Sequence, residues 1–181
     1  MWMPPISLVF WEAQMNKRLL FCVETTRQAD TDYAYIKETI RHYYEETRKT
    51  AYRAVYMESK TRYNSRSVQE EIRRQSGSAD TKVIYCIDTD DADVSQESKT
   101  LLDRIRQYCD TNDYEFIFFC KDVEDVYCGN SVSGSQKIPA IRKFKSSRAI
   151  EKMKTEYLES KQPRRHCSNI LTILDQYLTR K

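Results

Sequence analysis

The stretch KVIYCIDTDDAD, residues 82–93, constrains the fold of this chain most strongly. Its first half contains five consecutive apolar residues, Val83–Ile87, and its second half contains four aspartates. An apolar run of this length indicates a strand buried on both faces, as in parallel sheets that are covered by helices. The run stops abruptly at Asp88, so the strand is predicted to present carboxylates at its C-terminal end. In open α/β sheets this is the edge at which ligands bind.

Two other apolar runs also end in polar residues. Lys17–Val23 is followed by Glu24, and Glu115–Cys120 is followed by the polar cluster KDVED, while 54–57 is a short strand candidate. Amphipathic or polar patterns between and after these runs predict helices at about 32–49, 67–75, 96–110 and 147–160, and from Ser168 or Asn169 onward. This alternation predicts an α/β fold: a mostly parallel, Rossmann-like sheet with helices on both faces and further helices at the C-terminus.

The length of 181 residues suits one domain with small additions. We expect an N-terminal extension at 1–14, an α/β core at 15–130, and a C-terminal helical segment at 131–181 that packs on the core. The six cysteines contain no CxxC pair, which favours a reducing, cytoplasmic setting over a zinc site or a disulfide framework. The apolar N-terminal stretch is too short to span a bilayer, so no membrane partner is expected.

Asp88 and Asp90 are two residues apart, so in extended chain their side chains point the same way. Two carboxylates at a dry edge repel each other unless a cation lies between them. Mg²⁺ suits such a pair, because it uses one or two carboxylates and keeps water molecules for contact with phosphate. The alternative is a solvated acidic turn that only ends the strand.

Basic residues occur in three segments that could contact phosphates. The net charge of +3 is too small to prove a nucleic-acid partner, although basic residues can cluster locally. Solvated charged surface is the alternative for the segment that contains Lys60 and Arg62, and an ordinary surface histidine is the alternative for His166. The candidate nucleic-acid-binding residues are Lys60, Arg62, Arg142, Lys143, Arg165 and His166.

The order of these motifs resembles that of the TOPRIM domain. A strand ending in Glu, here FCVE with Glu24, precedes a strand ending in Asp-x-Asp, here IDTDD with Asp88 and Asp90. The stretch AIEKMKTEYLESKQPRRHCSNILTILDQYL is similar to the C-terminal end of the small RloB-like TOPRIM proteins, which are related to the OLD-family nucleases. DTDYAYIKETI resembles the start of their first helix. The chain departs from the pattern at Thr25, where many TOPRIM proteins have Gly, and at KDVED, which lacks an Asn-Pro element.

The resemblance implies a nuclease that depends on Mg²⁺ or Mn²⁺ and cleaves phosphodiester bonds in DNA or RNA, plausibly in prokaryotic anti-phage defence. Its metal ligands would be Asp88, Asp90 and Glu124, and Glu24 would be a further ligand or a general acid/base. Lys121 would stabilise developing negative charge, with His166 or Arg165 as second candidates. No GxxxxGK[ST] motif is present, so any ATP would require a separate ATPase or defence-system protein. A homo-oligomer is compatible with this function.

Two other functions stay open at this point. The missing Gly and Asn-Pro would fit a catalytically degenerate TOPRIM fold that binds or regulates a partner protein. A receiver-like domain would also cluster acidic residues at strand ends, although receivers lack the long polar crossover between residues 58 and 80. Metal binding distinguishes the nuclease from the catalytically degenerate fold, because a protein that only binds a partner does not need a metal ion.

Overall fold

The protein is described by a computed structural model that covers residues 17–181, so the expected extension at 1–14 lies outside the described residues. Its centre is a four-stranded sheet in the order β2-β1-β3-β4. Every pair of neighbouring strands is parallel. The strands are β1 (Lys17–Val23), β2 (Thr50–Tyr56), β3 (Thr81–Asp88) and β4 (Glu115–Phe119). The predicted α/β class is therefore confirmed.

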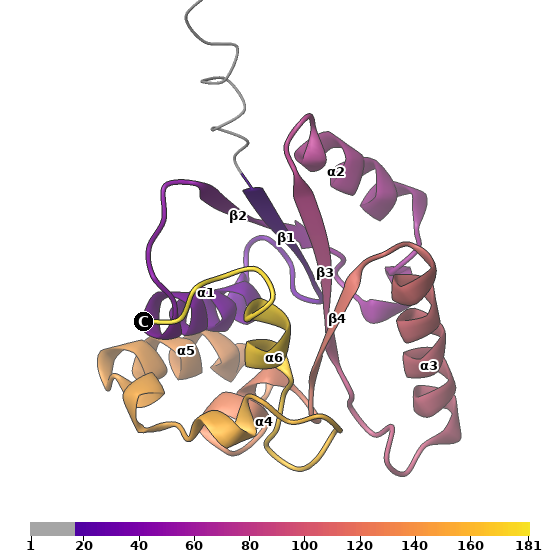
Figure 1. The fold of residues 1–181 in the computed structure, drawn as a ribbon. Helices are drawn as coiled ribbons and strands as arrows, with labels where there is room; N and C mark the ends of the chain where they lie inside the picture. The colour runs from indigo at the N-terminus through magenta and orange to yellow at the C-terminus, as the bar shows by residue number, and fades with distance from the viewer. Residues whose placement is uncertain (1–16) are drawn as a thin grey trace, which may run out of the picture.

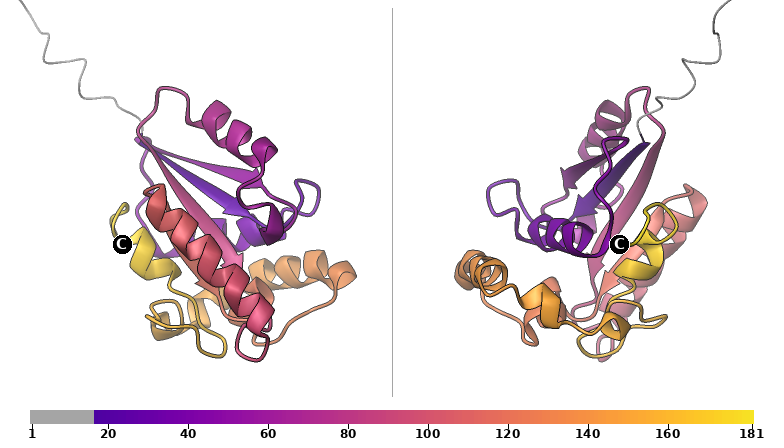
Figure 2. Two further views of the ribbon diagram at one scale, coloured as in Figure 1. Left: turned by 90° about the vertical axis from the view of Figure 1, so that its right-hand side faces the viewer. Right: turned by 60° about the vertical axis from the view of Figure 1, so that its left-hand side comes forward.

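Helices cover both faces of this sheet (Figures 1 and 2). One face carries α1 (Thr31–Tyr43), α4 (Val123–Cys128), α5 (Lys137–Ser146) and α6 (Ile170–Leu174). The other face carries α2 (Arg66–Ser76) and α3 (Gln96–Thr111). Short 3₁₀ helices occupy Lys60–Arg62, Gly134–Gln136, Ala149–Lys152 and Thr155–Tyr157.

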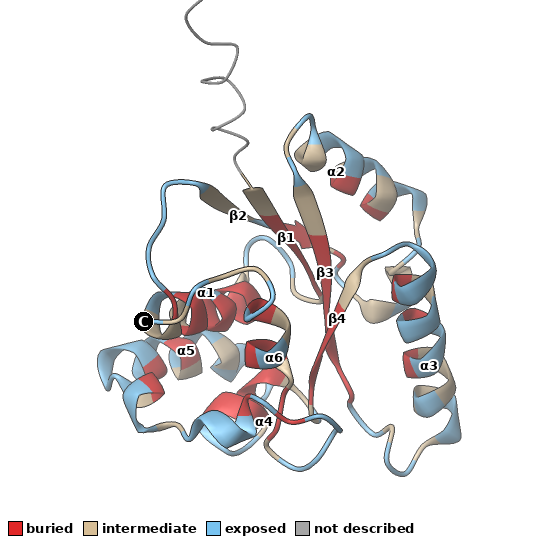
Figure 3. Ribbon diagram, viewed as in Figure 1, coloured by how far each residue is buried: buried red, intermediate tan, exposed pale blue. Residues whose placement is uncertain are grey.

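The strand β3 shows why the sequence forms a covered parallel sheet. Ile84 and Cys86 point into the core beneath α1 and α6, whereas Val83, Tyr85 and Ile87 point into the core beneath α2 and α3. All five side chains are buried, as the unbroken apolar run predicted. Figure 3 shows the same burial along the central strands and on the inward helix faces.

The outer edge of β4 is closed by the C-terminal segment. The Asn169 side chain accepts the N–H of Phe118 at 2.9 Å and donates to the carbonyl of Phe116 at 2.9 Å. Phe119 also forms an antiparallel bridge with Ser168. This edge is therefore satisfied by side chain and loop rather than by a fifth strand.

Two predicted boundaries around β2 were wrong. The first helix ends at Tyr43 rather than near residue 49, because Tyr44 is extended and forms a bridge with Arg180. The strand β2 begins at Thr50, earlier than the predicted 54–57, because its first residues pair with Lys17 and its neighbours on β1. Tertiary pairing overrides the local pattern at both positions.

The prediction of a continuous helix at 147–160 was also wrong. Arg148 has a φ of 51°, and Met153 and Lys154 are extended, so this stretch forms only the two 3₁₀ turns. A short helix that the sequence patterns did not predict, α4, follows β4 and is capped by the Asp122 carboxylate. No helix within residues 17–181 is long and apolar enough to cross a membrane.

Candidate acidic site

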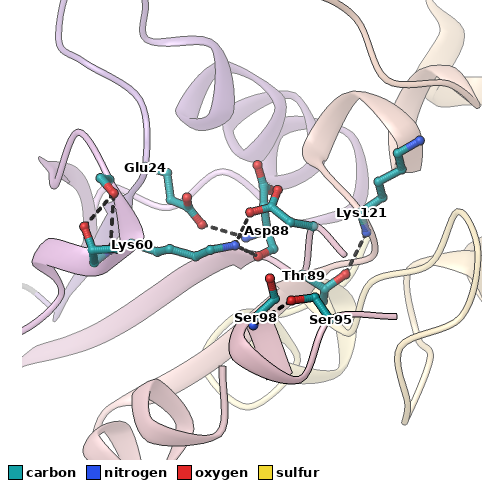
Figure 4. A network of polar contacts seen from close by, with 10 residues as sticks. Glu24, Lys60, Asp88, Thr89, Ser95, Ser98 and Lys121 are labelled. Carbon is teal, nitrogen blue, oxygen red and sulfur yellow. Dashed lines mark hydrogen bonds and ion pairs between the residues drawn. The ribbon is translucent and has the colours of Figure 1, made fainter. Parts of the chain in front are cut away.

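The sheet brings Glu24 and Asp88 together, because β1 and β3 are neighbours and both end at the same edge. The Glu24 Oε1 atom accepts the backbone N–H of Asp88 at 2.8 Å (Figure 4). This contact joins the two motifs on which the sequence analysis depended, FCVE and IDTDD. Glu24 and Asp88 therefore lie at the same edge of the sheet.

Both carboxyl groups are held where ionisation is costly. Burial raises the pKa of Glu24 to about 7, although Lys60 and the Asp88 N–H favour its charged form. Burial also raises the pKa of Asp88 well above its ordinary value, and the charge of Glu24 adds to that effect. A site of this kind binds protons near neutral pH unless another cation takes their place.

A third buried carboxyl, Asp32, completes this group and was missed in the sequence. It lies in the first turn of α1 and is 3% exposed. Burial raises the pKa of Asp32 to about 6, while Lys137 opposes that rise. Local sequence does not distinguish Asp32 as a site residue, because an acid at a helix start is usually only a favourable partner of the helix dipole.

Glu124 lies beside the same group and is completely buried at the start of α4. Its Oε2 atom is 3.2 Å from the Nζ atom of Lys137, the first residue of α5. Neither carboxylate oxygen has a well-oriented hydrogen-bond donor within residues 17–181. Burial raises the pKa of Glu124 despite the nearby ammonium group. Lys137 was also missed, since nothing in its local sequence marks it as part of the site.

Lys60 is the second ammonium group of the site. It reaches from the 3₁₀ turn after β2, and its Nζ atom donates to the Asp88 carbonyl at 2.8 Å and to the Asp90 carboxylate. Only 12% of its side chain is exposed. Figure 4 shows the chain of Lys60 extended toward Asp88 from the side of Glu24. Lys60 therefore lies in the acidic site itself rather than on an outer surface.

Asp90 is not aligned with Asp88 in the way that an extended chain would require. The strand β3 ends at Asp88, and Asp90 has a φ of 44°, in the left-handed region. Its side chain is 51% exposed and forms an ion pair with Lys60. The expectation of two parallel side chains was therefore wrong, because the backbone turns between them.

Lys121 contacts this region through its backbone. Its N–H donates to the Thr89 hydroxyl at 2.7 Å, and its carbonyl accepts the N–H of Asp90 at 2.8 Å. The side chain is exposed, and Figure 4 shows it directed away from Asp88 and Lys60. Lys121 thus fixes the turn that follows β3, and Lys60 is the lysine whose ammonium group enters the site.

His166 lies near the end of β4, in contact with α4. Its Nδ1 atom is 2.9 Å from the Oδ2 atom of Asp125, which is 8% exposed at the side chain. This pairing orients the imidazole ring. The neighbouring Arg165 is exposed.

The remaining predicted basic residues lie on helical surfaces. Arg62 is the last residue of the 3₁₀ turn that begins at Lys60, and it contacts Glu58 and Ser67. Arg142 and Lys143 are exposed on α5, the helix whose first residue is Lys137.

The donor chemistry of the acidic site fits a small divalent cation. Glu24, Asp32, Asp88 and Glu124 supply only carboxylate oxygens, which are the ligands that Mg²⁺ and Mn²⁺ favour. Within residues 17–181 neither buried Glu124 oxygen has a well-oriented hydrogen-bond donor, although the Lys137 ammonium group lies 3.2 Å from one of them, so a metal cation would add to their coordination. Across residues 17–181, no three acidic, Cys or His side chains form a ready-made metal cage. Mg²⁺ tolerates this, because it commonly binds through one or two carboxylates and several waters.

Comparisons of this chain with protein-family models, with curated proteins and with solved structures found no match.

Proposed function

We propose that the protein is a metal-dependent phosphodiesterase that cleaves nucleic acid at the acidic site. The observation that supports this most strongly is the hydrogen bond from the Asp88 backbone N–H to the Glu24 carboxylate, which joins two neighbouring strand ends whose carboxyl groups both have raised pKa values. Nearby positive charge would stabilise the ionised form of both carboxyl groups, which lie at the edge where parallel sheets bind ligands. Mg²⁺ or Mn²⁺ would supply that charge.

Asp88 would hold the cation together with other carboxylates of this group, such as Asp32 and Glu124, and Asp90 lies on the same turn. Glu24 would be either a further ligand or the general acid/base. When bound, the cation would neutralise the charge of a phosphodiester and make water a better nucleophile. In hydrolysis, water oxygen forms a bond to phosphorus, the bond from phosphorus to a sugar oxygen breaks, and that oxygen takes a proton.

The residues of the chain supply proton transfer and charge stabilisation. A carboxyl whose pKa is about 7 can exchange protons at neutral pH, so Glu24 suits the role of general base toward water or general acid toward the leaving oxygen. The ammonium group of Lys60, held beside Asp88, suits stabilisation of negative charge on the phosphate. We therefore assign to Lys60 the stabilisation of negative charge that was predicted for Lys121.

The test is cleavage of single-stranded DNA, duplex DNA and mixed RNA in Mg²⁺, in Mn²⁺ and in chelator. We expect cleavage that requires metal and falls on the order of hundredfold or more in Asp88→Asn. The matched control is Asp103→Asn, at an exposed position of α3, which should retain full activity.

Absence of cleavage in every metal by a folded protein would contradict the proposal. The buried carboxylates would then belong to a catalytically degenerate binding module. In that case Lys60 and Lys137 would act as permanent counter-ions in place of metal.

A further inference from the structure

A basic, aromatic groove runs along the outer edge of β2. It encloses about 500 Å³ and is lined by four arginines from four segments of the chain: Arg18, Arg27, Arg53 and Arg74. Three tyrosines, Tyr33, Tyr52 and Tyr56, complete most of its wall. Among residues 17–181 no carboxylate belongs to this lining, although Asp30 accepts the Tyr56 hydroxyl and Glu71 lies 3.9 Å from Arg27. None of these residues was among the predicted nucleic-acid contacts.

Two of these arginines form hydrogen bonds that stabilise the folded chain. Arg18 donates to the carbonyls of Gln75 and Ser76 at the end of α2. Arg74 pairs with Glu71 through two nitrogens, at 2.8 Å and 2.5 Å. These contacts fix the arginines along one wall of the groove.

The other two arginines have charge to offer a ligand. Arg53 is exposed and forms no ion pair within residues 17–181. Arg27 is 72% exposed at the side chain, and its nearest carboxylate, Glu71, is 3.9 Å away and already held by Arg74. A ligand with several negative charges would therefore meet the Arg53 guanidinium group, which has no ion pair within residues 17–181, and the exposed Arg27 group, whose contact with Glu71 is long at 3.9 Å.

One end of the groove lies at the C-terminal end of β2, the edge of the sheet that also carries the acidic site. Tyr56, at that end, pairs in register with Val23, the residue before Glu24. Arg27, also at that end, lies over the Tyr56 ring at 5.5 Å. The other end lies at Arg18, which aligns with Ala51. Five residue steps of strand separate Ala51 from Tyr56, about 16 Å, which accommodates a short run of nucleotides.

The edge of β2 is poorly suited to an added peptide strand. The N–H of Met57 donates to Val23 on β1. Successive residues of a strand turn their N–H and carbonyl groups to alternate sides, so those of Ala54 point away from β1. The Ala54 carbonyl already accepts a hydrogen bond from the Gln75 side chain at 2.9 Å. The exposed Arg53 further protects this edge from pairing with another strand.

A second cavity lies on the far side of Tyr52. It is less suited to a polyanion, because Glu45 and Glu46 offset the charge of its basic residues.

We propose that this groove binds the backbone of a single-stranded nucleic acid, with phosphates on Arg27 and Arg53 and a base against Tyr52. The proposal deepens the proposed function, since it places the strand that the acidic site would cleave. Arginines beside aromatic rings are the usual means of holding single strands without reading their sequence. The half-buried Tyr52 keeps part of its side chain accessible from the groove.

The test is fluorescence anisotropy with labelled single-stranded DNA, single-stranded RNA and duplex DNA, in chelator so that no cleavage occurs. We expect Arg27→Ala/Arg53→Ala to weaken single-strand binding on the order of tenfold and to lower the salt slope by about 1.4. The matched control, Lys99→Ala/Arg104→Ala, removes two exposed cations from α3 and should change neither value. Tyr52→Leu should weaken binding at an unchanged salt slope, because stacking releases no ions.

Equal weakening by both double variants, equal affinity for duplex, or no binding by the wild type would each overturn the proposal. The DNA and RNA arms identify which single strand the groove prefers. Binding in chelator is independent of catalysis. Groove-dependent binding without any cleavage would refute the proposed nuclease activity and support the groove as a single-strand site. Cleavage together with unchanged binding in Arg27→Ala/Arg53→Ala would support the nuclease activity and refute the groove.

Discussion

Replacement of Glu24 by Gln should stabilise the metal-free protein at pH 8. The folded protein keeps a proton on Glu24 up to about pH 7, whereas the unfolded chain releases it near the ordinary value of 4.5. The free energy of unfolding therefore falls as pH rises through this interval, because the folded state binds the extra proton. Glutamine keeps a carbonyl oxygen for the Asp88 N–H but has no charge to bury.

The magnitude follows from the difference between these two pKa values. At about 1.4 kcal/mol per unit, the penalty carried by ionised Glu24 at pH 8 is about 3 kcal/mol. For a domain of this size, that corresponds to a gain in melting temperature of roughly 6 to 12 °C in Glu24→Gln. The gain should vanish at pH 4.5, where the wild-type carboxyl is protonated in the folded protein.

The assay is thermal unfolding in chelator at intervals from pH 4.5 to 8, repeated with excess Mg²⁺. Mg²⁺ should stabilise the wild type at pH 8 and thereby narrow its difference from Glu24→Gln. Glu97→Gln, at an exposed position on α3, is the control and should shift stability by less than about 0.5 kcal/mol. A Glu24→Gln protein that is less stable than wild type at both ends of the pH range would refute the reasoning.

Two further predictions concern Lys60 and Asn169. Lys60→Met removes the cation that favours ionised Glu24, so the pKa of Glu24 should rise further. The loss of stability with rising pH should then extend to higher pH values. An unchanged pH profile of the melting temperature would contradict this. Lys99→Met, on the exposed surface of α3, is its control. Asn169→Ala should lower the free energy of unfolding by about 1–3 kcal/mol, measured in urea, because the Phe116 carbonyl and Phe118 N–H lose their partner. Asn112→Ala, which removes an exposed bond to Tyr108, should cost less, and equal costs would refute the role of Asn169 in closing β4.

The central strands could be predicted because burial on both faces leaves an unbroken apolar run, as in Val83–Ile87. The meeting of Glu24 and Asp88 followed from the same patterns, since parallel strands share one C-terminal edge. The end of α1 was not predictable in this way. Tyr44 continues the apolar helical spacing, and its pairing with Arg180 depends on the far end of the chain.

The candidate site was only partly visible for a similar reason. Glu24 and Asp88 interrupt apolar runs, whereas Asp32 resembles any acid at a helix start and Lys137 resembles any surface lysine. Their position near Asp88 arises from the packing of α1, α4 and α5 on one face of the sheet. Local sequence carries no signal for such a meeting.

Calorimetric titration of Mg²⁺ into the purified protein at pH 8 tests the central claim most directly. The account predicts saturable binding that releases protons, weakens at pH 6, disappears in Asp88→Asn and persists in Asp103→Asn, because cation and protons compete for the same raised-pKa carboxyls. Absence of binding at pH 8, or equal binding in Asp88→Asn, would contradict it.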